Sequence, residues 1–367
     1  MMTNLNRKQK RLIFTWAAVL ISFYILVTGV ASVIVGKDKT DALLRHNDRI
    51  DANSQEPGRT WIDPTVLKRD QQKEATKVSV GMYVDHIVDL STISTNWTVD
   101  FYIWFRWKDP NIHPGDTFQI MDGEILSCDK VDSTNYEGTQ YELYRVVAKI
   151  TKFFNVTRFP RDNHMLTIPI ENKVYTWQQM QYVPDIEVSD VSSRVILPDY
   201  KITKTYLVTK PHPYKTNRGD PRQTANTMIV YDQIIYGLAI SRPDWGLYFK
   251  MFESLFASVA IALLVFFMNP QGDGRVGLGI GAFFAAVASS YVTTSELPGI
   301  GVLTLSDLVN ILGMVTIFLS VLCSIVVMKI AEKENQLVLA RIFDKLSLVI
   351  FLSGYILANA AIAMIAS

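Results

Sequence analysis

The chain has 367 residues, of which nearly half are hydrophobic, and its basic and acidic side chains almost cancel to a net charge of +1. A net charge close to zero excludes no fold class and no enzyme activity. It gives no support to nucleic-acid binding or to polybasic attachment to a membrane surface. The apolar residues are unevenly placed, and several segments are long enough to span a bilayer. These segments are about 13–35, 247–268, 276–295, 305–328 and 346–366.

The first apolar segment follows a basic N-terminus, in which the four charged residues between Arg7 and Arg11 include no acid. The positive-inside rule therefore predicts a cytoplasmic N-terminus. The apolar run is long for the core of a signal peptide, so we favour a retained anchor within residues 1–36. A cleaved signal peptide is the alternative, because small residues at Gly29 to Ser32 offer a cleavage site. Both interpretations export the next segment.

Residues 37–77 are polar and charged, and their composition predicts a linker with room for one short helix. After the exported region, the C-terminal apolar segments must begin and end outside. That topology places the 269–275 turn and the 329–345 loop in the cytoplasm. The 329–345 loop contains lysine and arginine at four positions, in agreement with the positive-inside rule.

From Val78 onward, apolar and polar residues alternate with period two, and the apolar ones are rich in Val, Ile, Tyr, Phe and Trp. This pattern is typical of half-buried strands separated by short turns. We expect an all-β, immunoglobulin-like antiparallel sandwich over residues 78–242, fused directly to a four-helix transmembrane bundle over residues 243–367. The predicted strand stretches are 78–90, 97–109, 118–128, 141–154, 165–172, 199–208 and 227–242.

The segment 276–295 makes a poor lipid-facing helix although it is long enough to cross a bilayer. Glycine recurs at every second position from Gly277 to Gly281, and hydroxyl residues fill the far end from Ser289 to Ser295. Small residues let membrane helices approach closely, and polar residues face a bundle interior or a water-filled path. The pattern therefore predicts a pore-lining helix, with a packed core helix as the alternative.

The sequence offers no catalytic or metal-binding motif. It contains no nucleophile elbow and no phosphate-binding glycine loop, and the five histidines show no metal-ligand spacing. Cys128 lies in the exported part and Cys323 in an apolar segment, so they are not expected to form a disulfide. We predict a protein that is not an enzyme and that uses no cofactor and no metal.

Two motifs lie in the exported part. The stretch WTVDFYIWFRWKDP pairs Trp107 with Asp109. The stretch TKFFNVTRFPRDNHML carries an aromatic-proline-x-acid core at Phe159, Pro160 and Asp162.

Three further features lie toward the membrane part. Arg242 ends the last predicted strand, SELPGIGVLTLSD joins two apolar segments through Pro298 and Asp307, and the 329–345 loop is short. In their order and spacing, all five features resemble the pentameric ligand-gated ion channel superfamily in its prokaryotic branch. The resemblance covers about residues 78–366.

The chain also departs from that family. The cysteines that flank the signature loop in animal members would fall at Lys152 and Leu166, so the disulfide is absent, as it is in prokaryotic members. The N-terminal apolar segment is not part of the common pattern. The family's Trp-x-Pro-Asp ligand loop has no counterpart in residues 120–132, which leaves the agonist open.

The resemblance implies which face of the 276–295 helix lines a pore. Periodicity alone allows another stripe, through Ser289 and Val292, so the register comes from the family. Asp273 belongs to the same face at the cytoplasmic mouth. The pore-lining residues that the resemblance implies are Asp273, Gly277, Gly281, Phe284, Ala288, Tyr291 and Ser295.

Two positions on this face have distinct implied roles. Phe284 falls where the family places its central apolar ring, and five such side chains would form a gate by dewetting. The alternative is that Phe284 packs between helices. A ring of Asp273 carboxylates would attract cations, whereas Arg275 would oppose them if it faced the lumen; in the family the matching position is usually turned away.

For the ligand, the family commonly presents an aromatic box, because ring faces attract cations. Such strand aromatics are more often core residues than pocket residues. The ligand-binding candidates are Tyr102, Tyr175, Trp177, Tyr206 and Tyr214.

For coupling, the resemblance implies a charge-assisted pair between Asp162 and Arg242, with two unrelated solvated charges as the alternative. Phe159, Pro160 and Pro298 would shape the loops that meet at the membrane.

The sequence and the resemblance together predict a homopentameric, cation-selective channel that is opened by a ligand, such as an amine, or by protons. It would lie in a bacterial inner membrane with its strand domain on the periplasmic side. The rival hypothesis is a membrane-anchored sensor of the same organisation whose pore does not conduct.

Overall fold

The computed structural model describes residues 7–51, 74–214, 216–219, 221, 228–295, 297–298, 301–333 and 336–367. The chain divides into two compact units. The helical unit consists of Met1–Thr40, Asn155–Asp162 and Asp244–Ser367. The strand unit consists of Asp41–Phe154 and Asn163–Pro243. Glu296 and most of the predicted 37–77 linker lie outside the described residues.

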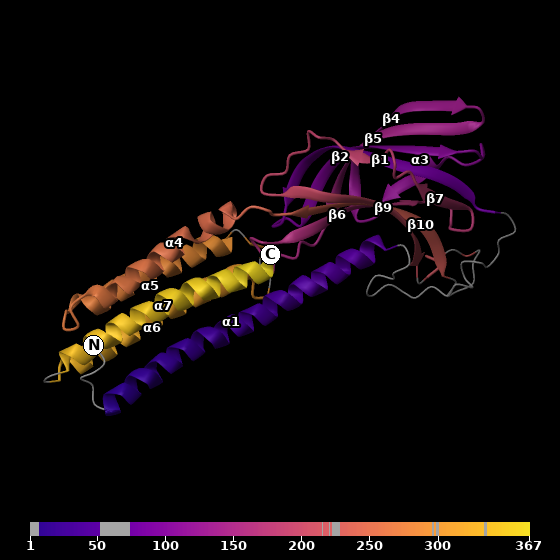
Figure 1. Ribbon diagram of the computed structural model, residues 1–367. Coiled ribbons are helices and arrows are strands. Elements are labelled where there is room, and N and C mark those ends of the chain that lie inside the picture. Colours follow the sequence, from indigo (N-terminus) through magenta and orange to yellow (C-terminus); the bar gives the residue numbers. More distant parts are fainter. Residues whose placement is uncertain are drawn as a thin grey trace. The chain divides into compact units, whose positions relative to one another are not determined.

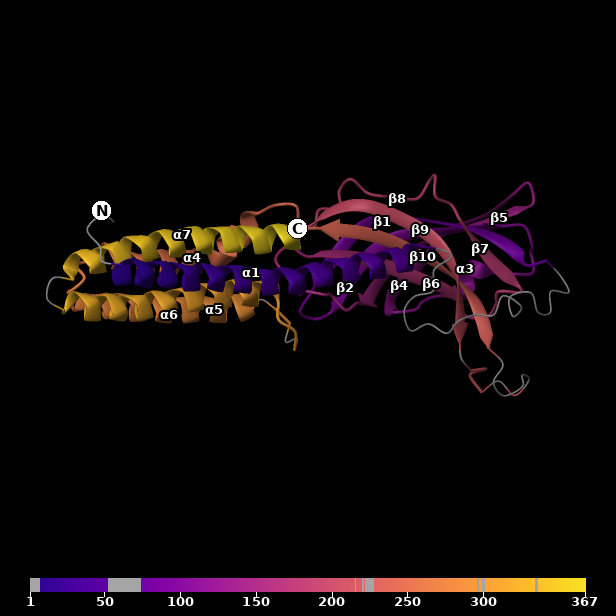
Figure 2. The same ribbon diagram turned by 60° about the horizontal axis from the view of Figure 1, so that its bottom comes forward.

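The helical unit contains the apolar segments that the sequence predicts. Its elements are α1 (Arg7–Ile50, of which residues up to Thr40 belong here), α4 (Gly246–Leu263), the 3₁₀ turn η1 (Leu264–Phe267), α5 (Gly274–Ser295), α6 (Leu305–Ala331) and α7 (Leu337–Ala366). Within this unit the helices run side by side (Figures 1 and 2). Five helices are long and apolar enough to cross a membrane, which fits a multi-pass membrane protein.

The N-terminal helix is an integral part of this bundle. The Tyr24 hydroxyl lies 3.0 Å from the Thr316 hydroxyl of α6, and the Tyr24 ring meets Phe351 of α7 edge-on. About two turns earlier on α1, Trp16 Nε1 donates to the Ser347 hydroxyl over 3.2 Å. Burying a hydroxyl or an indole N–H is costly unless the group forms a hydrogen bond. Rotating α1, or sliding it along its axis, would break these bonds and is therefore unfavourable.

The strand unit holds a six-stranded sheet in the order β4-β5-β2-β1-β7, with β8 also pairing with β1. Its strands are β1 (Thr76–Ser91), β2 (Asn96–Trp107), β4 (Gly123–Tyr136), β5 (Thr139–Thr151), β7 (Met180–Pro184) and β8 (Asp190–Val191). The pairs β4–β5, β5–β2 and β2–β1 are antiparallel, whereas β7 and β8 run parallel to β1.

The second sheet has four antiparallel strands in the order β3-β6-β10-β9. They are β3 (Phe118–Ile120), which follows the short helix α3 (Pro114–Thr117), β6 (Asn163–Asn172), β9 (Lys201–Tyr214) and β10 (Ile229–Ser241). Strand β10 is buried over almost its whole length, while β2 buries alternate side chains such as Phe101, Ile103 and Phe105. The period-two pattern therefore produces the core of this unit.

Each predicted strand stretch contains a strand, but the predicted fold class is wrong. The protein has mixed α and β content rather than an all-β sandwich fused to a four-helix bundle. The strand unit includes the last turns of α1, the helix α3 and parallel strand pairs, and the helical unit includes α1. Treating residues 37–77 as a linker hid the continuation of α1 to Ile50, because a charged helix surface resembles a linker in composition.

The packing of α1 makes a testable prediction at Gly354 of α7. A β-carbon there would lie 2.5 Å from the Tyr24 ring, so Gly354→Ala should lower the stability of the detergent-solubilised protein by about 1–3 kcal/mol. Thermal unfolding measures the change. The neighbouring Ser353→Ala is the control, since Ser353 is exposed and bonds only within its own helix in the described contacts. If Tyr24→Ala does not relieve the loss, α1 does not pack at this glycine.

Candidate functional site

One face of α5 packs inside the helical unit. Ser289 bonds to Ser254 of α4 over 2.7 Å, and Thr293 accepts a hydrogen bond from Asn310 of α6 over 2.7 Å. Gly279 allows close approach to α6, because a β-carbon there would lie 2.3 Å from Val321. The buried residues of α5 are Arg275, Gly279, Ala282, Ala286, Ser289 and Thr293.

The opposite face of α5 is exposed on the single chain. Phe284 and Tyr291 are 68% and 79% exposed, although both are large aromatic side chains. Of the alternative stripe, Ser289 is buried and Val292 is exposed. The exposed set includes every position that the resemblance implied for a pore: Asp273, Gly277, Gly281, Phe284, Ala288, Tyr291 and Ser295.

Arg275 points away from this exposed face. Its side chain is fully buried, and its guanidinium makes a bidentate pair with Asp344 of α7. It also donates to the Ser324 hydroxyl over 3.0 Å and to the Met268 carbonyl over 3.1 Å. Asp273, two residues earlier, is exposed. The carboxylate and the guanidinium therefore lie on different sides of the α5 N-terminus.

Sequence reasoning missed Asp344, because it assigned residues 329–345 to a loop. The sequence did contain a signal, because Asp344 lies beside a long apolar segment. An acidic side chain that such a helix buries needs a cationic or hydrogen-bonding partner. Ser324 gave no comparable signal, because serine is common in membrane helices.

The loop Asn155–Asp162 belongs to the helical unit although β5 and β6, which flank it, belong to the strand unit. The Thr157 carbonyl accepts from the Leu305 amide over 2.7 Å, and the Phe159 carbonyl accepts from the Ser306 hydroxyl over 3.0 Å. Both contacts hold the loop at the start of α6, where Thr304 forms a capping box with Asp307.

The same loop also contacts α1 and α7. Arg158 is buried, with its Nε 3.2 Å from the Asp38 carboxylate and its Nη1 3.2 Å from the Ala366 carbonyl. Asn155 donates to Asp38 over 2.7 Å. The loop is therefore fixed to three helices of its unit.

The remaining coupling candidates lie as follows. Phe159, Pro160 and Asp162 are buried, and the Phe159–Pro160 peptide bond is cis. Pro298 is half-buried. Arg242 belongs to the strand unit, where it donates to the Tyr200 hydroxyl over 2.8 Å and lies 3.7 Å from Asp199. Its predicted pairing with Asp162 stays a prediction.

The aromatic ligand candidates are all half-buried: Tyr102 lies on β2, Tyr175 and Trp177 lie between β6 and β7, and Tyr206 and Tyr214 lie on β9. Cations of the same chain lie over three of their rings: Arg145 at 5.6 Å from the centroid of Tyr102, Lys204 at 4.8 Å from Tyr206, and Arg218 at 3.7 Å from Tyr214. Among the described ring contacts, none joins two of the five candidates. Within one chain they do not form a box.

The other two candidates, Tyr175 and Trp177, form hydrogen bonds in which the backbone takes part. The Tyr175 hydroxyl accepts from the His113 amide over 3.4 Å, and the Trp177 amide donates to the Val230 carbonyl over 2.8 Å.

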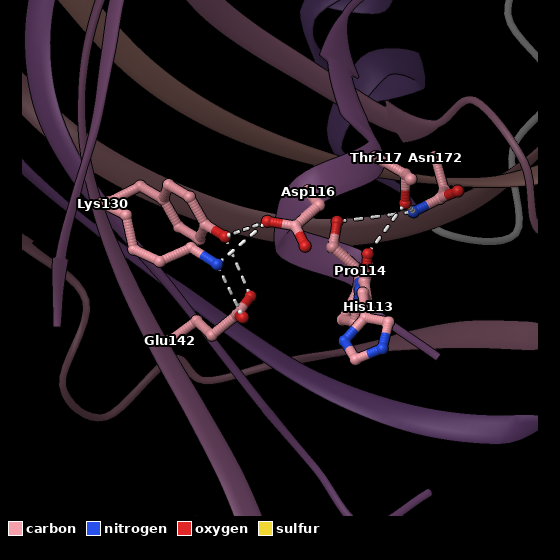
Figure 3. Close-up of polar contacts among 8 residues, drawn as sticks. His113, Pro114, Asp116, Thr117, Lys130, Glu142 and Asn172 are labelled. Carbon is pink, nitrogen blue, oxygen red and sulfur yellow. Dashed lines mark hydrogen bonds and ion pairs between the residues drawn. The ribbon is translucent and has the colours of Figure 1, made fainter. Parts of the chain in front are cut away.

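The fold brings together one group of metal-ligand type that the sequence did not reveal. One ligand atom each of His113, Asp116 and Glu142 lie within 4.8 Å of one another. However, Lys130 Nζ lies between the two carboxylates, 2.9 Å from Asp116 and 3.0 Å from Glu142, as Figure 3 shows. Its neighbours Tyr144, Asp116 and Glu142 raise the pKa of Lys130, so the ammonium already supplies the cation of this cluster.

No model of a known protein family matches the chain. The function is therefore argued from the geometry of the two units.

The Lys130 cluster allows a test of the strand unit. Glu142 is buried, and Lys130→Met would leave its carboxylate with only the Tyr144 hydroxyl, 2.9 Å away, among the described contacts. Because an unpaired buried carboxylate is costly, we expect a loss of about 1–2 kcal/mol at neutral pH.

Thermal or denaturant unfolding measures this effect. Lys149→Met, at an exposed β5 position of the same hairpin, is the matched control. An equal loss from both variants would mean that Lys130 does not neutralise Glu142.

Proposed function

We propose that this protein is the subunit of a homopentameric, ligand-gated, cation-selective channel, whose pore is lined by the exposed face of α5. The observation that carries the proposal is this face. On a single chain it is unpartnered, and it mixes polar or small residues with large apolar ones. The small and polar residues are Asp273, Gly277, Gly281, Ala288 and Ser295, and the exposed apolar ones are Ile280, Phe284, Val287, Tyr291 and Val292. The glycines, the hydroxyl group and the carboxylate suit a water-filled path between several copies better than they suit lipid.

The charges at the start of α5 support cation selectivity. Arg275 is neutralised by Asp344 inside the bundle, so its charge is not available to a lumen on the exposed face. The side chain of Asp273 is exposed, like the other residues of that face. A ring of Asp273 carboxylates would then set the sign of the field at the pore mouth and would attract cations.

The path of the chain supports control by the strand unit. The chain passes between the units after Thr40, Phe154, Asp162 and Pro243. The inserted loop Asn155–Asp162 is held by α1, α6 and α7, while only residues 242–245 separate β10 from α4. A ligand-induced shift of β5, β6 or β10 would therefore pull directly on helices of the bundle.

The rival function is a sensor of the same organisation that does not conduct. The bulk of Phe284 and Tyr291 on the exposed face favours this rival, because five copies of each ring would fill a narrow lumen. Both hypotheses place the ligand in the strand unit, and they differ only in whether the pore conducts ions.

Phe284→Ala separates the two functions. If Phe284 forms a dewetted gate, removing its ring should raise the resting conductance of the purified protein in planar bilayers by at least about tenfold, because water re-enters the constriction. Phe283→Ala is the matched control, since the adjacent Phe283 packs against the bundle core. Silence of wild type and Phe284→Ala alike, in protein shown to be pentameric, would favour the sensor.

Asp273→Asn tests selectivity in the conducting background. Removing the carboxylate ring should shift the reversal potential in a salt gradient toward zero, because the mouth no longer concentrates cations. Glu253→Gln, which removes an exposed acid on α4, should leave the reversal potential unchanged. An unchanged preference in Asp273→Asn would contradict the proposed role of this ring.

A further inference from the structure

A cavity of about 240 Å³ lies in the strand unit, between the end of α1 and the two sheets. Its wall is formed by Arg49 from the last turn of α1, Asp122 from the β3–β4 turn, Lys152 just after β5, and His212 and Gln233 from β9 and β10. The volume is below the ~300–1,000 Å³ that is typical of sites for drug-sized ligands, so it suits a small molecule.

Backbone hydrogen bonds fix the wall of this cavity. The Met121 amide donates to the Pro169 carbonyl over 3.0 Å, and the Thr151 amide donates to the Asp122 carbonyl over 2.7 Å. The Lys152 amide donates to the Thr95 carbonyl over 2.8 Å. The charged side chains therefore project from a backbone that is held by both sheets.

The end of α1 is fixed as well. The buried Lys210 of β9 donates to the backbone carbonyl of Asp48, which lies in the last turn of α1. A cation is favourable at this place because the last carbonyls of a helix lack amide partners and carry a partial negative charge. The contact positions Arg49 at the cavity.

The cavity wall carries two basic side chains, Arg49 and Lys152, and one acidic side chain, Asp122. Burial, and then the nearby Arg49, lower the pKa of Lys152 to about 7, while Asp122 acts in the opposite direction. The one buried carboxylate behind the wall, Glu171, is already engaged: it contacts the His212 ring, and it accepts from Tyr214 over 2.8 Å and from Gln233 over 3.1 Å.

We propose that this cavity binds a small organic carboxylate, held by Arg49 and Lys152. A planar carboxylate matches the fork of an arginine guanidinium, and a nearby ammonium adds a second charge-assisted hydrogen bond. Asp122 at the same wall would repel a second acid group close to it, and it limits how much negative charge the site accepts. An incoming anion would relieve the repulsion between two cations that the fold holds in one partly buried space.

Binding at this site should be coupled to the uptake of a proton, and this coupling can be measured. Lys152 faces Arg49 from α1, Asp122 from the β3–β4 turn and His212 from β9, with Glu171 behind His212. Above its pKa of about 7, most of the Lys152 side chains in the free protein are neutral. A bound carboxylate favours the ammonium, so binding at about pH 8 should take up a proton.

The test is isothermal titration calorimetry of the full chain in detergent, with succinate as the probe and neutral succinamide as its uncharged analogue. We expect succinate to bind, succinamide not to bind, and the succinate heat to differ between two buffers of unequal ionisation enthalpy in the sense of proton uptake. No succinate binding up to about 10 mM, or equal binding of succinamide, would overturn the proposal.

Variants locate the site. Arg49→Gln should weaken succinate binding at least about tenfold, which is the loss of one charge-assisted hydrogen bond. Arg45→Gln, on an exposed position one turn earlier on α1, should leave the affinity unchanged.

Lys152→Gln should weaken binding and abolish the difference between buffers, while its thermal unfolding shows that the fold is retained. This variant removes a charge that is costly to bury, so loss of folding is not expected. Unchanged affinity in Arg49→Gln and Lys152→Gln would overturn the site. The test needs no open pore, so its failure leaves the proposed channel function untouched, and the reverse also holds.

Discussion

The buried pair of Arg275 and Asp344 decides which face of α5 is free. Moving two ions out of water is costly, and only good geometry with further hydrogen bonds offsets that cost. Here the pairing is bidentate, and Ser324 and Met268 accept two further guanidinium protons. Breaking such a pair by removing one partner typically costs about 3–5 kcal/mol, so rotation of α5 that withdraws Arg275 is strongly disfavoured. The exposed face with Phe284 follows from that fixed rotation.

The same logic extends along α5 toward its C-terminal end. Gly279 lets α6 approach, and the bonds of Ser289 to Ser254 and of Thr293 to Asn310 hold the far turns. Polar groups inside a membrane bundle act as directional contacts, because unpaired ones would be costly in hydrocarbon. A helix fixed by a buried ion pair at one end and by hydroxyl contacts at the other presents one invariant surface. Any change in a pore lined by that surface must come from movement of whole helices.

Sequence patterns predicted local structure well and assembly poorly. Alternation located the longer strands because burial of one sheet face imposes period two, as in Phe101, Ile103 and Phe105. It missed the short strands β7 and β8, which pair in parallel with β1. The pattern could not show that β3 and β4 separate at Met121 into different sheets, since a turn of two residues hardly interrupts an apolar stretch. It also could not show that α1 joins the bundle, because the partners of Tyr24 are about three hundred positions away in sequence.

The candidate sites divide in the same way. Spacing at three and four residues allowed more than one face of α5, and the resemblance chose among them. The side on which Arg275 lies depended on Asp344, which is distant in sequence. The cavity at Lys152 had no sequence signal, because its wall combines a helix end, a turn and strands from both sheets. Lys152 itself stands where animal channels of the resembled family have a disulfide cysteine. The lysine at that position shows that the disulfide is absent, but it does not indicate that the residue lines a cavity.

Local contacts in the strand unit bear on whether its ligand is a cation or an anion. An aromatic box attracts a cation only if its ring faces are open, but Arg145, Lys204 and Arg218 already lie over the rings of three candidates. An added ammonium group would have to displace a tethered cation whose local concentration is high. At the cavity the situation is reversed, because Arg49 and Lys152 repel each other and a carboxylate would lower that repulsion. For this unit, the charged side chains that line an enclosed space are a better guide to a ligand than the presence of aromatic rings.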